Sequence, residues 1–125
     1  MQHTLLVMLG GAIGAALRYH LGKVALRVAG AAWPWGTLAA NVLGGLAMGL
    51  LAGWLALRAT GGEPVRLFLA VGVLGGFTTF SAFSLETLLM IERGEMASAL
   101  AYAVVSVGAS VGALSLGLLA MRSLA

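Results

Sequence analysis

Polar side chains that could handle an ion occur inside long apolar stretches of this chain, where each is costly unless paired or wetted. Asn41 follows Thr37 by one helical turn, so the two share a face. Tyr102, Ser106 and Ser110 recur at a spacing of four residues and form a single polar stripe on a helix. All five side chains carry hydrogen-bond donors, so the pattern favours an anion over a cation.

Two charged residues also fall within apolar stretches. Arg18 lies about three-quarters of the way along the first one, and Glu86 lies in the third. Each polar residue has a plainer explanation as well. Arg18 could extend to the headgroups, Asn41 could join two helices by a hydrogen bond, and the serines could bond to carbonyls of their own helix. The role of Glu86 stays open at this stage.

Phe80 and Phe83 follow one another at a spacing of three residues and so share a helix face. An ordinary core or lipid-facing pair is the usual explanation of this spacing. An aromatic ring, however, has a positive edge and a negative face. Phenylalanine edges beside hydrogen-bond donors would attract a small anion without holding it permanently, which is what conduction requires.

The elements that position these residues are predicted to be membrane helices. Of the 125 residues, 61% are hydrophobic and 9% are charged, which does not fit a soluble domain. Apolar segments of spanning length run over residues 4–26, 35–57, 65–91 and 96–121, joined by short connections. The sequence therefore predicts one all-α membrane domain over residues 1–125, with sequential spans antiparallel.

The third segment is longer than a straight span needs, and LGGFTTFSAF lies in its middle. Gly75 and Gly76 lower helix propensity, and Thr78 and Thr79 are β-branched and can bond to backbone groups themselves. We expect a broken helix with its break near residues 75–79. Irregular backbone at membrane depth requires burial in protein or a water-filled cavity, and it exposes carbonyls and a helix N-terminus to ions.

Basic residues at the two ends of the spans are balanced. One side carries Arg58, Arg66 and Arg122, and the other carries Lys23, Arg27 and Arg93. Orientation normally follows an excess of Lys and Arg on one side, and no excess is present here. The chain is predicted to insert in both orientations and to form an antiparallel homodimer, since four spans are few to enclose a pathway.

Glycines recur at a spacing of four residues in three of the spans, which allows close helix packing in a bilayer. The pairs and triplets are Gly10 and Gly14, then Gly45, Gly49 and Gly53, and finally Gly108 and Gly112.

Several classes of protein are excluded by composition. No cysteine is present, so disulfides and thiol chemistry are absent, and no acidic dyad or nucleophile–base arrangement indicates an enzyme. The net charge of +3 does not indicate nucleic-acid binding, because the basic residues are scattered at helix ends. The N-terminus lacks the basic region of a signal peptide.

Three stretches resemble the Fluc (CrcB) family of fluoride channels: GGAIGAALRY (residues 10–19), GTLAANVLGG (36–45) and GVLGGFTTFSAFSLE (72–86). The resemblance extends over all four spans, with the motifs in the same order. It implies a dual-topology antiparallel homodimer in the cell inner membrane, with two fluoride pathways and a central sodium ion. It also implies passive export of fluoride from the cytoplasm, which lowers fluoride toxicity.

The resemblance further implies roles for individual residues. Gly75 and Thr78 would offer backbone carbonyls to the structural sodium ion at the dimer interface. One departure is Ala82, where the family often has threonine or serine. The fluoride pathway would comprise Asn41, Phe80, Phe83, Thr37, Thr79, Tyr102, Ser106, Ser110 and Arg18, the last near a vestibule.

Two other functions remain as alternatives. A proton-coupled small multidrug exporter also has four short spans and dual topology, but it needs a carboxylate in the first span, which has none. A fluoride–proton antiporter is not distinguished from a channel by the residues alone. A subunit whose polar residues serve only packing is the third possibility.

Overall fold

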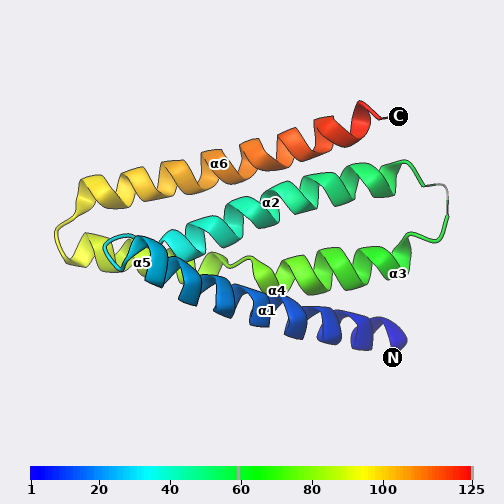
Figure 1. Ribbon diagram of the computed structural model, residues 1–125, viewed down its shortest axis with the longest axis horizontal. Coiled ribbons are helices and arrows are strands. Elements are labelled where there is room, and N and C mark those ends of the chain that lie inside the picture. The colour runs from blue at the N-terminus through cyan, green and yellow to red at the C-terminus, as the bar shows by residue number, and fades with distance from the viewer. Residues whose placement is uncertain (59, 125) are drawn as a thin grey trace.

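The computed structural model describes residues 1–58 and 60–124, and long helices running side by side make up almost all of this part (Figure 1). No strand occurs among the described residues. The helices in chain order are α1 (Gln2–Ala29), α2 (Trp35–Ala56), α3 (Glu63–Val65), the π-helix η1 (Arg66–Leu74), α4 (Gly75–Phe77), α5 (Phe80–Glu92) and α6 (Met96–Arg122).

Four helical stretches are long and apolar enough to cross a membrane: Gln2–Ala29, Trp35–Ala56, Glu63–Glu92 and Met96–Arg122. The third consists of α3, η1, α4 and α5 in succession. The predicted class, all-α with four long apolar helices and an interrupted third, is therefore confirmed. Most large apolar side chains point outward, as expected where lipid is the solvent.

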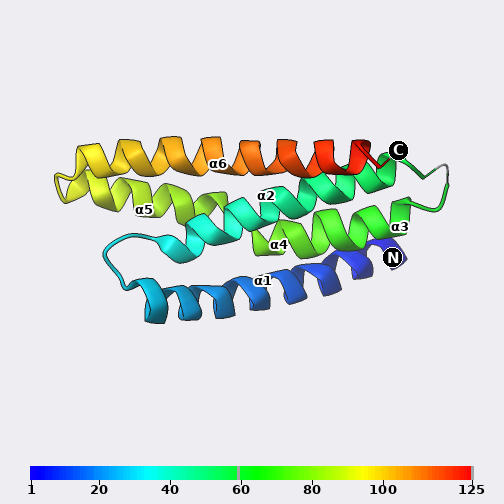
Figure 2. The ribbon, with the colours of Figure 1, turned by 45° about the horizontal axis from the view of Figure 1, so that its top comes forward.

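Consecutive spans run in opposite directions (Figure 2). Both termini and the connection between α2 and α3 lie at one end of the bundle, and the connections from α1 to α2 and from α5 to α6 lie at the other. Gly30 ends α1 with φ of 80°, and Gly94 turns the chain before α6 with φ of 81°. Both positions favour glycine because a Cβ disfavours this left-handed region.

The third span is interrupted within the predicted range, at two of its residues. Gly75 is still helical, with φ −61° and ψ −38°. The break consists of Thr78 (φ −85°, ψ 159°) and Thr79 (φ −151°, ψ 122°), both extended. The break lies within the predicted range 75–79, at its C-terminal end. The π-helix before it was not predicted, since periodicity does not separate i+5 from i+4 bonding.

Two glycine contacts bring α2 against α6. A Cβ on Gly45 would lie 2.6 Å from the Ser110 carbonyl oxygen, and one on Gly49 would overlap the Leu114 carbonyl oxygen. Gly117 of α6 packs in return against the Leu46 carbonyl. Backbone therefore contacts backbone along this pair, as expected where small residues drive association in a bilayer.

Helix α1 packs in the same way on η1 and α4. Gly10 and Gly14 face the backbone of η1, and Gly76 faces the backbone of Gly11. The prediction for Gly108 and Gly112 is wrong within this subunit, because a Cβ on either would meet nothing within 4 Å. Their spacing makes a stripe on α6, but that stripe lies on the outer face, away from α2.

These contacts predict different outcomes for alanine substitutions at two glycines, Gly49 and Gly112, although glycine has the same low helix propensity at both. Gly49→Ala should destabilise the subunit by about 1–3 kcal/mol, because a methyl group has no room between α2 and α6. Gly112→Ala should leave stability unchanged or raise it slightly, since the site is open and alanine favours helix. Thermal unfolding in detergent measures both. Equal stability of the two variants would contradict the packing described.

Candidate functional site

The break in the third span is held by one side chain from α2. Asn41 Nδ2 donates to the Thr79 carbonyl at 3.0 Å, and Asn41 Oδ1 accepts from the Thr79 N–H at 2.8 Å. The carboxamide thus pairs with both polar groups of the Thr79 backbone, as a neighbouring strand would. This pairing satisfies backbone groups that an interrupted helix would otherwise leave without partners.

The same rearrangement frees two carbonyls. In a continuous helix the Thr79 amide would donate to Gly75, and the Ala82 amide would donate to Thr78. The Thr79 amide instead donates to Asn41, and the Ala82 amide donates to Thr79 Oγ1 at 3.1 Å. The carbonyls of Gly75 and Thr78 therefore lose their regular helical donors.

Arg18 contacts the break from α1 on its other side. Its Nε donates to the Gly76 carbonyl at 3.2 Å, at the C-terminus of α4, where a cation is favoured by the helix dipole. Arg18 lines a separate cavity with Lys23 and Thr37. Among the predicted pathway residues, Arg18 is thus held at the break but is not brought to the phenylalanines.

A groove of about 380 Å³ runs along the other face of the break. It lies between α2, the break, α5 and α6, and it is open on one side. Six predicted pathway residues line it together with Thr78: Asn41, Thr79, Phe80, Phe83, Ser106 and Ser110.

The groove contains hydroxyl groups that have no partner. Ser106 Oγ and Ser110 Oγ are buried and form no hydrogen bond with the described residues. Buried hydroxyls are normally paired, so two unpaired ones on one helix face indicate that a ligand or water completes them. Each hydroxyl has one hydrogen bond to donate.

The two phenylalanines stand on α5 beside these hydroxyls. The ring centroids of Phe80 and Phe83 lie 5.5 Å apart at an interplanar angle of 41°. Phe83 packs on the core, whereas Phe80 is 77% exposed and extends away from the subunit. Phe80 therefore stands at the open edge of the groove and faces out of the subunit, as most large apolar side chains of this chain do.

Tyr102 was predicted to share a stripe with the two serines, and Thr37 to share a face with Asn41, but the two hydroxyls have a partner of their own. Tyr102 OH donates to Glu86 Oε1 at 3.0 Å, and Thr37 Oγ1 donates to Glu86 Oε2 at 2.9 Å. The role that the sequence left open for Glu86 is thus to accept from both hydroxyls. The sequence could have predicted this pairing, because a carboxylate inside a membrane span seldom lacks a partner and two neighbouring spans carry hydroxyl donors.

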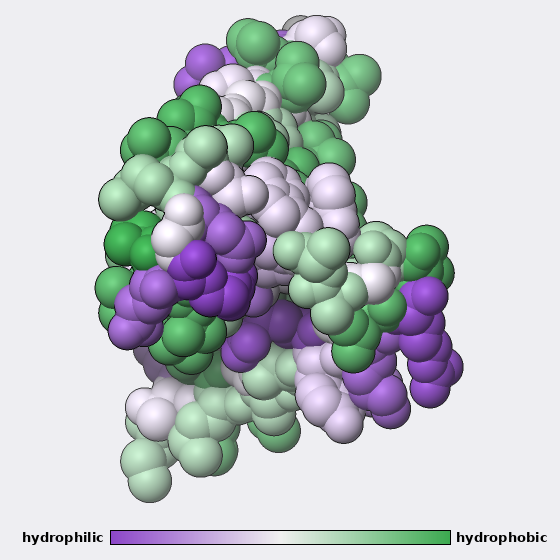
Figure 3. Space-filling view, turned by 90° about the vertical axis from the view of Figure 1, so that its left-hand side faces the viewer, coloured by the Kyte–Doolittle hydropathy of each residue, from purple (hydrophilic) through white to green (hydrophobic). Residues whose placement is uncertain are grey.

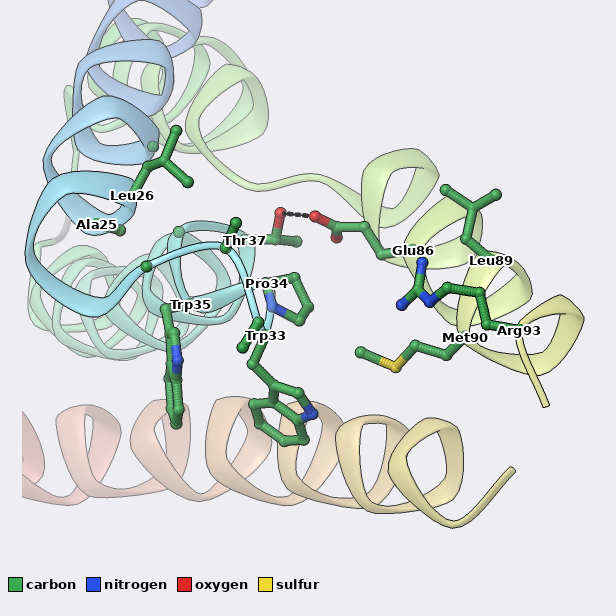
Figure 4. Close-up of a pocket in the computed structure, with 15 residues that line it drawn as sticks. Ala25, Leu26, Trp33, Pro34, Trp35, Thr37, Glu86, Leu89, Met90 and Arg93 are labelled. Carbon is green, nitrogen blue, oxygen red and sulfur yellow. Dashed lines mark hydrogen bonds between the residues drawn. The ribbon is translucent and has the colours of Figure 1, made fainter. Parts of the chain in front are cut away.

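Glu86 also faces a cavity of about 340 Å³ at the end of the bundle where α1 joins α2. Viewed from this end, the molecule is hollowed, and hydrophilic side chains lie around and inside the hollow (Figure 3). Figure 4 shows Glu86 and Met90 on α5, and Arg93 directly after it, facing Thr37, Pro34 and Trp33 across the cavity. Glu86 and Thr37 thus line the end cavity and do not line the groove.

The free carbonyls fit a hard monovalent cation, which prefers oxygen ligands. Gly75 is exposed, and a Cβ there would meet only the Ala70 carbonyl, at 3.6 Å, so the backbone is approachable from outside the subunit. Two carbonyls from one chain are too few for such an ion. No group of three or more His, Asp or Glu side chains that could bind a metal occurs among residues 1–58 and 60–124.

Comparison with known proteins gives consistent matches over the whole chain. The family model described as "CrcB-like protein, Camphor Resistance (CrcB)" matches residues 5–118. The fluoride-specific ion channel FluC of Novosphingobium aromaticivorans is 58% identical over 127 residues, covering 100% of both chains. The proteins of the same name from Hyphomonas neptunium and Phenylobacterium zucineum are 60% and 58% identical, and at least 94% of each chain is covered.

The Asn41 pairing predicts a stability effect that does not depend on function. Asn41→Ala should lower the free energy of unfolding by about 2–4 kcal/mol, because the Thr79 N–H and C=O lose their partners in an apolar setting. Ser115→Ala is the control, since it removes only a bond to a carbonyl of its own helix and should cost less than about 0.5 kcal/mol. Thermal unfolding in detergent compares the two, and equal costs would refute the role given to Asn41.

Proposed function

This chain belongs to the CrcB-like family, and we propose that it is a fluoride-specific ion channel, a multi-pass protein of the bacterial inner membrane that conducts fluoride passively. The relatives that match it over their full length bear that name, and the family is one of channels, not of enzymes. Export of fluoride from the cytoplasm would lower its toxicity to the cell.

The observation that carries the proposal is the groove beside the break. Its lining includes Ser106 and Ser110, whose hydroxyls have no partner in the subunit, together with Phe80 and Phe83. Fluoride is small and strongly hydrated, so dense donors are needed to replace its water. Neutral donors and ring edges attract the ion but still release it, as conduction requires.

A second copy in the opposite orientation completes the proposed channel. The groove is open, Phe80 projects from the subunit and Gly75 is exposed at the break. Two breaks meeting at a two-fold axis would bring four carbonyls together, two from Gly75 and two from Thr78, as ligands for a structural sodium ion. The balance of basic residues between the two ends supports insertion both ways.

The drug exporter is the weaker alternative. Such a protein needs a carboxylate in its first span that is free to exchange a proton for the substrate, and α1 contains none. Glu86 lies on α5, where both its oxygens already accept hydrogen bonds.

Fluoride efflux from liposomes, with and without an imposed pH gradient, separates the candidates. A channel releases fluoride equally in both conditions, with chloride efflux at least about 100-fold slower, since a larger halide cannot reach all the donors at once. An antiporter would change its rate with the gradient, because each fluoride that leaves is exchanged for a proton. Absence of fluoride flux from the folded protein would overturn the proposal.

Replacing the exposed phenylalanine tests the pathway. Phe80→Ile should reduce fluoride efflux at least about 100-fold, because an isoleucine has no positive edge, while the dimer persists. Phe68→Ile is the control: Phe68 is half-buried in η1, does not line the groove and should leave the rate within about 3-fold. A Phe80→Ile protein that conducts normally would show that the groove is not the route.

A size series at Gly75 tests the assembly. Gly75→Ala should be tolerated, whereas Gly75→Leu should abolish dimers without loss of helix content. The space around Gly75 is open in the single subunit, but in the proposed dimer the second copy would occupy it. Size-exclusion chromatography and far-UV circular dichroism measure the two properties. A normal dimer of Gly75→Leu with unchanged flux would place the interface elsewhere.

A further inference from the structure

The connection from α1 to α2 inserts one large side chain into the bundle. Trp33 is half-buried and packs against the core cluster that includes Met90 and Tyr102, although the two alanines before it are exposed. Its indole Nε1 donates to Ser98 Oγ at 3.4 Å, one turn before Tyr102 on α6. Trp33 is therefore attached to α6 by both a polar and an aromatic contact.

An unbroken row of rings leads from this connection to the groove. Trp33 meets Tyr102 edge to face, with centroids 5.4 Å apart at 69°. Tyr102 lies 5.1 Å from Phe83, and Phe83 lies 5.5 Å from Phe80. Each ring in the row thus limits the tilt of the next one.

Tyr102 is the middle of this row and has no freedom to relax outward. Its exposed fraction is 0%, and its hydroxyl is held by Glu86. Trp33 and Phe83 are its two ring neighbours. Without the indole, a space would open beside Tyr102, and both Tyr102 and Phe83 could tilt into it.

We propose that Trp33 is a positioning residue for ion selectivity, acting through Tyr102 to fix the orientation of the Phe83 ring. The proposal rests on the channel function. Since a ring attracts an anion at its edge and repels it at its face, a small tilt of Phe83 changes how strongly the groove favours fluoride. Trp33 itself lies in the wall of the end cavity and does not line the groove.

Trp35 provides a matched control. It also stands near this membrane end and packs on Trp33, with centroids 5.1 Å apart. It is 42% exposed, and the aromatic contact that it makes is with Trp33 and not with Tyr102. Loss of either tryptophan removes a large aromatic side chain, but only Trp33 has a ring contact with Tyr102.

The experiment compares Trp33→Met, Trp33→Phe, Trp35→Met and the unsubstituted chain in the same liposomes, with fluoride and chloride efflux measured separately. We expect Trp33→Met to lower the fluoride-to-chloride rate ratio about 10-fold, the upper end of a lost aromatic-pair preference. Trp33→Phe should restore the ratio to within about 3-fold, because a ring again abuts Tyr102. Trp35→Met should leave it unchanged.

The outcomes separate this inference from the channel function. If the unsubstituted chain does not conduct fluoride, the proposed function fails. If it conducts and Trp33→Met keeps its selectivity, or if Trp35→Met loses as much, the positioning role is overturned. A drop in the number of active liposomes with an unchanged rate ratio would show a structural role only.

A second measurement covers the case in which Trp33→Met does not fold. In a Trp35→Phe, Trp54→Phe chain, Trp33 is the single tryptophan left, and its ring remains in the row. Its fluorescence should change with added fluoride in a saturable way and not with chloride. An emission unaffected by fluoride would contradict the coupling between Trp33 and the groove.

Discussion

The structure depends on how the polar backbone of the third span is satisfied where its helix stops. Thr78 and Thr79 are extended in the middle of an apolar bundle, where unpaired peptide groups cost several kcal/mol each. Asn41 pairs with both polar groups of Thr79, and the Thr79 hydroxyl caps the following helix. Because these partners replace the regular helical acceptors, the carbonyls of Gly75 and Thr78 lose their helical donors. The Asn41 amide thus stabilises the break and takes the regular donor of the Gly75 carbonyl, while the Thr79 hydroxyl takes that of the Thr78 carbonyl.

Close packing of the helices makes this arrangement possible. Asn41 reaches the break because Gly44, one turn further on α2, lies against the Thr78 side chain with no room for a Cβ. Gly45 and Gly49 then bring α6 close enough for Ser106 and Ser110 to face the same groove. In lipid, apolar burial adds little to helix association, so backbone contact at glycines supplies much of the attraction. The glycines therefore determine where the donors stand as well as how tightly the helices pack.

The sequence predicts the elements and most of the groove, because both follow from local rules. Apolar length gives the spans, Gly75 to Thr79 give the break, and the i, i+4 spacing places Ser106 and Ser110 on one face. These rules do not predict which partner each polar side chain chooses for its hydrogen bond. Tyr102 shares the serine stripe, yet its hydroxyl is long enough to reach Glu86, and Arg18 turns to a carbonyl of the break. Gly108 and Gly112 have the spacing of a packing stripe, but spacing does not say which helix, if any, it meets.

The donors of the groove are neutral, and this suits conduction better than a charged lining would. A guanidinium or ammonium group in an apolar groove would bind a small anion strongly, since Coulomb attraction rises steeply as the dielectric constant falls. Arg18 instead donates to a backbone carbonyl outside the groove, and the remaining basic side chains lie nearer the helix ends. There they can raise the local concentration of anions without trapping them. Hydroxyl groups and ring edges offer several weak contacts in sequence, so in the proposed dimer an ion can exchange one for the next along the groove.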